Sequence, residues 1–212
     1  MEVYGVKPKR FTKEWWEYFW EYYKWHTIAT IVLIILFITS INDCVHRINY
    51  DLQVDYISEH QISEEASNAL TALIEENIDD VTENGKKEAY VTLLDMKENP
   101  DPQYTQAMYT KYSVEMAYIE SFVFLMSKKY ADELSDMGVF EASENWTSAP
   151  SYNGYCISLE DCTALKEIGI DTGDLYLGII KLKEQEKVSE REKKLLQQEN
   201  GIKFAKFLIS KR

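Results

Sequence analysis

Apolar positions near the start of the chain form one long segment. From Thr27 to Ile41 fifteen residues carry no charge, and the stretch from Trp15 to Trp25 holds eight aromatic rings in eleven residues. At ~1.5 Å per residue the uncharged run covers about 22 Å, short of the ~30 Å hydrocarbon core of a bilayer. Because the rings supply the missing turns, the pattern predicts one continuous helix over residues 12–42, first lying in the membrane interface and then crossing the membrane.

The aromatic stretch has one narrow polar stripe. Glu14, Glu17, Glu21 and Lys24 recur at spacings of three and four, which places them on one side of a helix and the rings on the remaining surface. Trp and Tyr suit the level of lipid headgroups, where one end of the ring is dry and the other is wet. The residues predicted to lie at the membrane interface are Trp15, Trp16, Trp20, Tyr22, Tyr23 and Trp25.

Three other interpretations compete with an uncleaved anchor. A cleaved signal peptide starts with a short basic region and ends in small residues, whereas this start is ring-rich and Thr39-Ser40-Ile41 is a poor cleavage site. A lipoprotein signal would place small apolar residues before Cys44, where Asn-Asp stands instead. A buried core helix seldom holds four Trp at this density, because each buried indole N–H needs a partner. The pattern favours an anchor that stays in the membrane.

Basic residues are concentrated before the predicted span. Only Arg47 follows the span closely, whereas five basic residues precede it, namely Lys7, Lys9, Arg10, Lys13 and Lys24. Since Lys and Arg close to a span favour the cytoplasm, we expect a cell-membrane protein with its N-terminus inside and the remaining chain outside. The expected organisation is a cytoplasmic tail (1–11), the aromatic and transmembrane helix (12–42), a short tether (43–49) and an extracytoplasmic domain (50–212).

The outer part alternates strand-like and helix-like patterns. Leu52 to Ile57 alternates apolar and polar residues, which is typical of a strand, and Ser63 followed by two acids is typical of a helix start. The patterns predict strands at 52–57, 89–94, 121–126 and 175–182, and helices at 63–78, 103–119, 128–137, 162–168 and 189–209, with a poor signal over 141–159. Alternation with long connections predicts a three-layer α/β domain, its mostly parallel sheet of about four or five strands covered by helices on both faces.

Composition limits the partners of this outer part. Residues 43–212 hold 18 Lys and Arg against 32 Asp and Glu, a net charge of −14, and the 166 residues from Arg47 to the last residue suffice for a single domain. Such a surface repels phosphates, so nucleic acid is not a predicted partner. In the mixed-charge run from Lys181 to Lys194 the positive and negative charges nearly cancel, which is typical of a solvated loop and helix face.

The three cysteines allow one disulfide. Cys156 and Cys162 are six positions apart and can form a disulfide in an oxidising exterior. Cys44, next to the bilayer, would then be the cysteine outside this disulfide. The alternative is that all three are ordinary thiols. They do not form a metal site, because the ligands are too few and too widely spaced.

Other chemical motifs are weak. Asp80 to Gly85 begins like a calcium loop, but Val91 stands at the twelfth position, where a bidentate Glu is needed, so a plain turn is expected. The pairs Glu75-Glu76 and Asp79-Asp80 are expected on a solvated helical face. The segment 171–174 is expected to be a turn, at most making weak contacts at a strand mouth, and His60, the one histidine of the outer domain, is expected in a polar loop. No catalytic or phosphate-binding motif is present, so neither enzyme activity nor a cofactor is predicted.

One stretch resembles part of the extracellular solute-binding proteins. It is the run from Tyr112 to Phe140, YSVEMAYIESFVFLMSKKYADELSDMGVF, in which a helix leads into a buried strand, a short helix and a G-x-F turn. The order of elements from Leu52 resembles the first lobe of that fold. The similarity covers about 90 residues and implies a single lobe, whereas those proteins clamp a solute between two. The whole chain also resembles small, uncharacterised single-span proteins of anaerobic Gram-positive bacteria, which implies a topology and no activity.

Two functions fit these observations. The first is a non-catalytic interaction subunit of a transporter or secretion complex, whose aromatic helix packs against a membrane-protein partner while the outer domain docks on it. The second is a tethered single-lobe module that binds a small molecule or a peptide. A flat apolar patch on the outer domain would favour the first, and a polar pocket at the strand ends the second.

Overall fold

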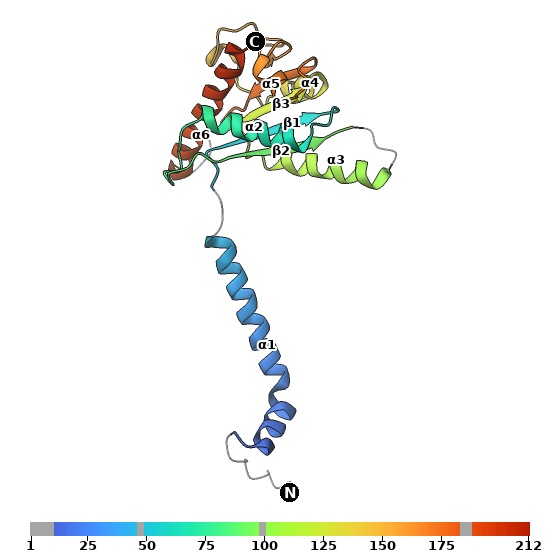
Figure 1. Cartoon of the computed structure of the whole chain (residues 1–212), viewed down its shortest axis with the longest axis vertical. Helices are drawn as coiled ribbons and strands as arrows, with labels where there is room; N and C mark the ends of the chain where they lie inside the picture. Colours follow the sequence, from blue (N-terminus) through green and yellow to red (C-terminus); the bar gives the residue numbers. More distant parts are fainter. Residues whose placement is uncertain (1–10, 46–48, 98–100, 183–187) are drawn as a thin grey trace. The chain divides into compact units, whose positions relative to one another are not determined.

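The computed structural model describes residues 11–45, 49–97, 101–182 and 188–212. The chain divides into two compact units, residues 1–48 and 49–212, and each is described by itself (Figure 1). Residues 1–10 of the predicted tail, 46–48 of the predicted tether and 183–187 of the mixed-charge run lie outside the described residues.

The first unit is a single helix. Helix α1 runs through Lys13–Val45 for 33 residues, which corresponds to about 50 Å, so the continuous helix predicted over 12–42 is present and ends three residues later. Within it Tyr23–Ser40 has a mean hydropathy of 1.5 and no buried residue. By length and composition this helix is long and apolar enough to span a membrane.

The second unit is an α/β domain. Its elements are β1 (Leu52–Ser58), α2 (Glu64–Asn77), β2 (Ala89–Asp95), α3 (Pro102–Ala117), β3 (Val123–Ser127), α4 (Lys128–Asp136), the 3₁₀ helix η1 (Ser143–Asn145), β4 (Ile157–Ser158), α5 (Thr163–Glu167), β5 (Leu175–Ile179) and α6 (Val188–Ser210). The predicted strands and helices are all present. Ser63 caps α2 as expected, since its hydroxyl accepts a hydrogen bond from Ala66 N at 3.1 Å.

The five strands form one mixed sheet in the order β2-β1-β3-β5-β4. β1 pairs in parallel with β2 and β3, whereas β5 is antiparallel to both β3 and β4. Four strands therefore point in one direction and β5 opposes them. The expectation of a mostly parallel sheet is confirmed, and β5 is the strand that departs from it.

The short strand β4 explains the reversal of β5. After α4, Phe140 bridges to Ile180, just beyond the end of β5. β4 then runs in the direction of β3, and the chain reaches Asp174 beside Lys128, where β3 gives way to α4. β5 has to run back from that edge. The sequence shows no clear strand over 141–159, so β4 is a strand that the sequence did not predict.

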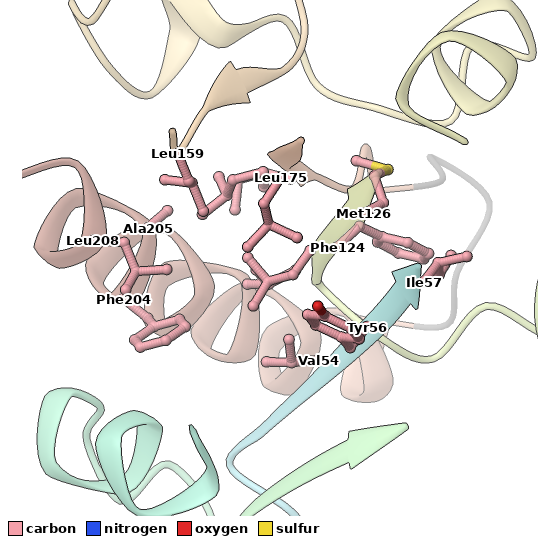
Figure 2. Packing of buried hydrophobic residues seen from close by; sticks show 14 of the residues in the cluster. Val54, Tyr56, Ile57, Phe124, Met126, Leu159, Leu175, Phe204, Ala205 and Leu208 are labelled. Atoms are coloured by element: carbon pink, nitrogen blue, oxygen red, sulfur yellow. The ribbon is translucent and has the colours of Figure 1, made fainter. Parts of the chain in front are cut away.

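The core lies between the sheet and its helices. All five residues of β3 are buried, as expected of a strand covered on both faces. Val54 and Tyr56 of β1 belong to the same buried cluster as Phe204 and Leu208 of α6 (Figure 2). Elsewhere along α6, a Cβ at Gly201 would lie 3.0 Å from the Val123 side chain, so this helix approaches the sheet closely at a residue without a side chain.

Polar side chains fix α6 to the start of β1. Asn200 is buried and donates to the carbonyls of Asp51, at 3.3 Å, and Asp79, at 2.8 Å. Gln197 donates to the carbonyl of Tyr50 at 2.7 Å. Because these bonds join positions more than 120 residues apart, the last helix closes the domain onto its first strand.

Candidate functional site

Helix α3 differs from the other long helices of the outer domain because none of its sixteen residues is buried. It begins at Asp101, whose carboxylate accepts a hydrogen bond from Gln103 N at 2.9 Å, and Pro102 occupies the first helical position. The N-terminus of α3 is therefore stabilised by its own capping residues, yet the helix adds no fully buried side chain to the core.

Polar contacts hold this helix to its neighbours. Lys111 Nζ donates to the carbonyl of Leu93 in the edge strand β2 at 2.8 Å. Tyr112 Oη donates to Glu133 Oε1 of α4 at 3.1 Å, and its ring lies 5.6 Å from that of Tyr130. Tyr112 contacts α4 on one side of α3, while Lys111 lies at the border of the side that is exposed to solvent.

The exposed side of α3 carries two shallow hollows of about 670 and 290 Å³. Their lining residues, which we call the α3 outer face, are Pro102, Gln103, Gln106, Ala107, Tyr109, Thr110, Lys111, Ser113, Val114, Ala117 and Tyr118. Apart from Lys111, none of these residues carries a charge at neutral pH, in a chain with 28% charged residues.

Large apolar side chains are exposed along this face. Tyr118 is 76% exposed, Val114 55% and Tyr109 47%. Single exposed apolar residues are common on soluble proteins, whereas a contiguous uncharged patch is typical of a contact surface. Lys111 donates to the uncharged carbonyl of Leu93 and keeps its charge, so the face carries a single positive charge on an acidic domain.

The sheet below α3 holds a buried carboxylate. Asp55 in the middle of β1 is fully buried; its Oδ1 accepts a hydrogen bond from Ser121 Oγ at 2.6 Å, and its Oδ2 has no hydrogen-bond partner within the described part of the chain. Burial, with a smaller contribution from the nearby Glu115 of α3, raises the pKa of Asp55 to about 6. Burial also raises the pKa of Glu115. Asp55 is thus a proton-binding group that solvent does not reach.

The carboxyl ends of β1 and β3 are where an open α/β sheet binds ligands, because the strand order reverses there. Ser127 ends β3 and precedes α4; it is buried, and its hydroxyl neither caps the helix nor has a partner among the described residues. Lys129, in the first turn, pairs with Glu59 at 3.1 Å. Lys128 N donates to Asp174 Oδ2 at 3.4 Å, so the protein's own carboxylate already faces this helix end.

The calcium-like segment is a hydrogen-bonded turn. Asp80 accepts hydrogen bonds from Thr82 Oγ1 at 3.2 Å and Gly85 N at 2.8 Å. Below it the buried Asp51 accepts three backbone hydrogen bonds, from Val81 N at 2.9 Å and from Thr82 N and Glu88 N at 2.8 Å each. Within the described ranges no three His, Cys, Asp or Glu residues are grouped so as to hold a metal ion.

The remaining acidic candidates bind to the protein itself. Glu75 and Glu76 lie on α2, but Asp79 and Asp80 lie beyond its end at Asn77, so the expectation that both pairs share a helical face is wrong for the second pair. Lys203 Nζ lies 2.7 Å from both carboxylate oxygens of Asp79 and lowers its pKa. Asp171 Oδ1 accepts from Gly173 N at 2.9 Å within a turn, as expected.

Both described cysteines are buried free thiols. Cys156 Sγ lies 3.5 Å from Ser135 Oγ, and Cys162 Sγ lies 3.5 Å from the carbonyl oxygen of Leu208. Burial raises the pKa of Cys156 to about 11 and that of Cys162 in the same direction. A bond between the two would require both sulfur atoms to leave these partners. The side chain of Cys44 lies outside the described part.

Several rings of α1 contact one another, and Trp16 lies edge-on to Trp15 at 5.0 Å and to Phe19 at 6.0 Å. Trp15 and Phe19 stack at 5.4 Å, and Phe19 and Tyr23 at 5.7 Å, with interplanar angles of 20° and 21°. Other interface candidates point to solvent: Trp16 is 53% exposed, Trp20 56% and Trp25 73%. The side chain of Tyr22 is not among those described. The helix thus carries a run of stacked rings together with indoles that are more than half exposed.

No family model, curated protein or solved structure matches this chain. The resemblance to one lobe of a solute-binding protein stays an expectation from the sequence. What the chain does therefore has to follow from the geometry of its own residues.

Sequence patterns missed the α3 outer face and Asp55. Asp55 stands at a polar position of an alternating strand, and such positions usually face solvent. In the structure α3 lies near Asp55, because Glu115 of this helix interacts electrostatically with the Asp55 carboxylate. The sequence did hold a sign of the α3 outer face, namely the scarcity of charges. Between Asp101 and Glu120, which flank the helix, Lys111 is the one charged residue on its outer side. That signal becomes meaningful only when the structure shows which side of the helix is exposed.

Proposed function

We propose that the protein is a non-catalytic, membrane-anchored interaction subunit whose outer domain docks on a partner through the α3 outer face. The observation that supports this function is the exposure of Tyr109, Val114 and Tyr118 on a face with a single charged residue. Aromatic and apolar side chains surrounded by neutral polar groups are typical of the centre of a protein–protein interface. The partner belongs to a membrane complex such as a transporter or a secretion assembly.

The proposed topology places this face outside the cytoplasm. The basic residues before the span favour a cytoplasmic N-terminus, α1 crosses the lipid bilayer of the cell membrane once, and the three-layer domain lies on the far side. The exposed indoles of Trp16, Trp20 and Trp25 lie at the headgroup level or against the partner. With residues 43–212 at a net charge of −14, the domain stays soluble everywhere except on the α3 outer face.

A charge placed in the centre of the face tests this function. Val114→Glu introduces a carboxylate that a docked partner would have to desolvate. Leu196→Glu on α6 is the matched control, because Leu196 is also a large exposed apolar residue at 41%. The intact protein is isolated from its native membrane in mild detergent. We expect the wild type and Leu196→Glu to retain the same set of membrane partners and Val114→Glu to lose them at least about tenfold; equal recovery in all three would refute docking through α3.

A second candidate function is a single-lobe module that binds a solute or a peptide. It is favoured by one observation, the buried and unpartnered hydroxyl of Ser127 at the strand ends, beside the first turn of α4. A solute with an anionic end would replace the Asp174 carboxylate, which now accepts a hydrogen bond from Lys128 N, in the field of the helix dipole. Thermal-shift screening of anionic solutes on the intact protein, compared with Ser127→Ala, tests it. A stabilising ligand that acts equally on Ser127→Ala, or no such ligand, excludes this site.

A further inference from the structure

The buried carboxylate of Asp55 lies between two strands and next to α3. In the sheet its register partners are Thr92 of β2 on one side and Phe124 of β3 on the other. Asp55 is completely buried, and its Oδ2 has no hydrogen-bond partner among the described residues. A buried polar atom without a partner is costly, and the cost rises when the group is charged. Ionised Asp55 therefore gains more from contact with water than protonated Asp55 does.

The charged side chains that act on Asp55 belong to α3. Glu115 raises the pKa of the carboxyl, and Lys111 lowers it by a smaller amount, so the helix as a whole opposes ionisation. The sheet contributes neutral hydroxyls. Ser121 Oγ donates to Oδ1 at 2.6 Å, Thr92 lies alongside in β2, and both favour the ionised form. Ionisation thus sets Asp55 against the helix, not against its neighbours in the sheet.

Polar contacts at its edges hold α3 in place. None of its residues is buried, and apolar side chains that pack against the core, such as Tyr112 and Met116, are only partly buried. Helix α2, by contrast, buries three residues. Side-chain hydrogen bonds join α3 to β2 and α4, namely Lys111–Leu93 at 2.8 Å and, at 3.1 Å each, Tyr104–Asp95 and Tyr112–Glu133. Local opening occurs where few apolar contacts are buried, so α3 can leave the sheet at a lower cost than α2.

We propose that α3 is a pH-dependent cover of Asp55: the protonated carboxyl keeps the helix packed on the sheet, and ionisation of the carboxyl releases the helix. Release brings water to Asp55 and separates it from Glu115. This inference goes beyond docking through the α3 outer face, because it concerns how the helix is attached and not what binds to it.

The direction of the effect follows from the pKa of Asp55. That pKa is about 6 in the covered carboxyl, above the ordinary value of 3.8. A group with a raised pKa stabilises the state in which it is raised, and this stabilisation is complete at low pH and is lost as pH rises through about 6. The helix is therefore held at acid pH and released at neutral pH.

Hydrogen exchange of the intact protein in mild detergent, followed by mass spectrometry, tests this release. A detached helix of this length is only marginally stable in water, so the amides of α3 exchange when the cover opens. With intrinsic exchange rates corrected for pH, we expect the protection of α3 to be about tenfold lower at pH 7.5 than at pH 5. Asp55→Asn should make the protection of α3 nearly independent of pH. Glu115→Gln, which removes the repulsion, should make the pH difference smaller.

Low concentrations of urea distinguish release of α3 from unfolding of the whole domain. Local opening exposes little surface and responds weakly to urea, whereas global unfolding exposes much surface and responds strongly. At pH 7.5 and below the unfolding transition, we expect urea to leave the protection of α3 unchanged and to lower the protection of α2. Helix α2 thus serves as the reference within the same molecule.

Three results would overturn the proposal. The first is equal protection of α3 at the two pH values in the wild type, and the second is a pH difference that persists undiminished in Asp55→Asn. The third is protection of α3 and α2 that falls together with urea, since α3 would then open only when the whole domain unfolds. If Asp55→Asn does not fold, Glu115→Gln decides, and an undiminished pH difference in that variant overturns the proposal.

Discussion

Ser121 Oγ donates a 2.6 Å hydrogen bond to Oδ1 of Asp55, a residue 66 positions earlier in the chain. Both side chains are buried, and Glu115 of α3 adds negative charge close to the carboxylate. The bond favours the ionised acid, but burial outweighs it and the pKa rises to about 6. The domain thus keeps a costly acid beside the helix that we propose as its docking element.

Asp55 makes the stability of the domain depend on pH. Its folded pKa of about 6 lies above the ordinary aspartate pKa of 3.8, so its stabilising contribution is complete below the unfolded pKa and is lost as pH rises through about 6. We expect the free energy of unfolding to increase by about 1 kcal/mol between pH 7.5 and pH 5. Urea denaturation of the intact protein in mild detergent, followed by circular dichroism, measures this change.

Asp55→Asn is the matched variant for the pH dependence. An amide keeps the shape and cannot ionise, so the variant should be more stable than the wild type at pH 7.5 and nearly independent of pH over the same range. Glu115, whose pKa burial also raises, acts in the same direction and leaves a small residual slope. A wild-type protein that loses stability on acidification to pH 5 would show that Asp55 is not the dominant titrating group.

Gly178 of β5 leaves room for Phe140. A Cβ at position 178 would lie 2.9 Å from Phe140 Cε1 and 3.0 Å from Met126 Cε, so Gly178→Ala forces a buried ring to shift. We expect a loss of about 1–3 kcal/mol in the free energy of unfolding. Combining it with Phe140→Leu should cost less than the sum of the two single changes, because the smaller side chain relieves the clash. Additive losses would mean that the two residues do not compete for space.

Asp51 holds the loop after α2, where the sequence resembles a calcium site. Asp51→Ala leaves three backbone N–H groups of the loop without their acceptor, and we expect a loss of about 3 kcal/mol or more. Asp80→Ala is the control on the same loop, because Asp80 is only half-buried whereas Asp51 is fully buried, and its loss should be about 1 kcal/mol. Thermal unfolding compares the stability of the two variants. A larger loss for Asp80→Ala than for Asp51→Ala would show that the turn around Asp80 contributes more to the stability of the loop than Asp51 does.

The regular elements were predictable because they depend on local sequence. Ser63 starts α2, Pro102 starts α3, and the uninterrupted apolar run predicts the buried strand β3. The direction of β5 was not predictable, because it depends on the two-residue strand β4, which is too short to show a period. β4 is recognised only by its pairing with β5, and the paired residues lie about 20 positions apart in the chain.

The candidate site was less predictable than the fold. Whether Val114 faces the sheet or solvent depends on how α3 is placed by the bonds of Lys111 and Tyr112, and neither bond has a signal in the sequence. Likewise Asp55 occupies a polar position in an alternating strand, and its burial follows only from the packing around it. Local patterns thus give the elements, while exposure and pKa depend on contacts between distant segments.

The buried thiols should react only when the protein unfolds. A thiolate is the reactive form, and burial raises the pKa of Cys156 to about 11 and raises that of Cys162. In a Cys44→Ser background at pH 8, we expect no labelling of the folded protein by a thiol reagent and two labelled thiols in denaturant without a reductant. No labelled thiols in denaturant would show that Cys156 and Cys162 are joined in the purified protein.

The exposed indoles of α1 distinguish an anchor from a contact surface. Trp16→Ala with Trp20→Ala removes two exposed rings and leaves the apolar stretch Tyr23–Ser40 intact, so we expect the protein to remain in the membrane fraction. If these rings contact a partner, recovery of a differently tagged second copy or of other membrane proteins falls several-fold. Trp15→Ala is the control, because that ring stacks on Phe19 within the helix, and its loss should leave partner recovery unchanged. A double variant that leaves the membrane but keeps its partners in detergent would show that the rings act as interfacial anchors alone.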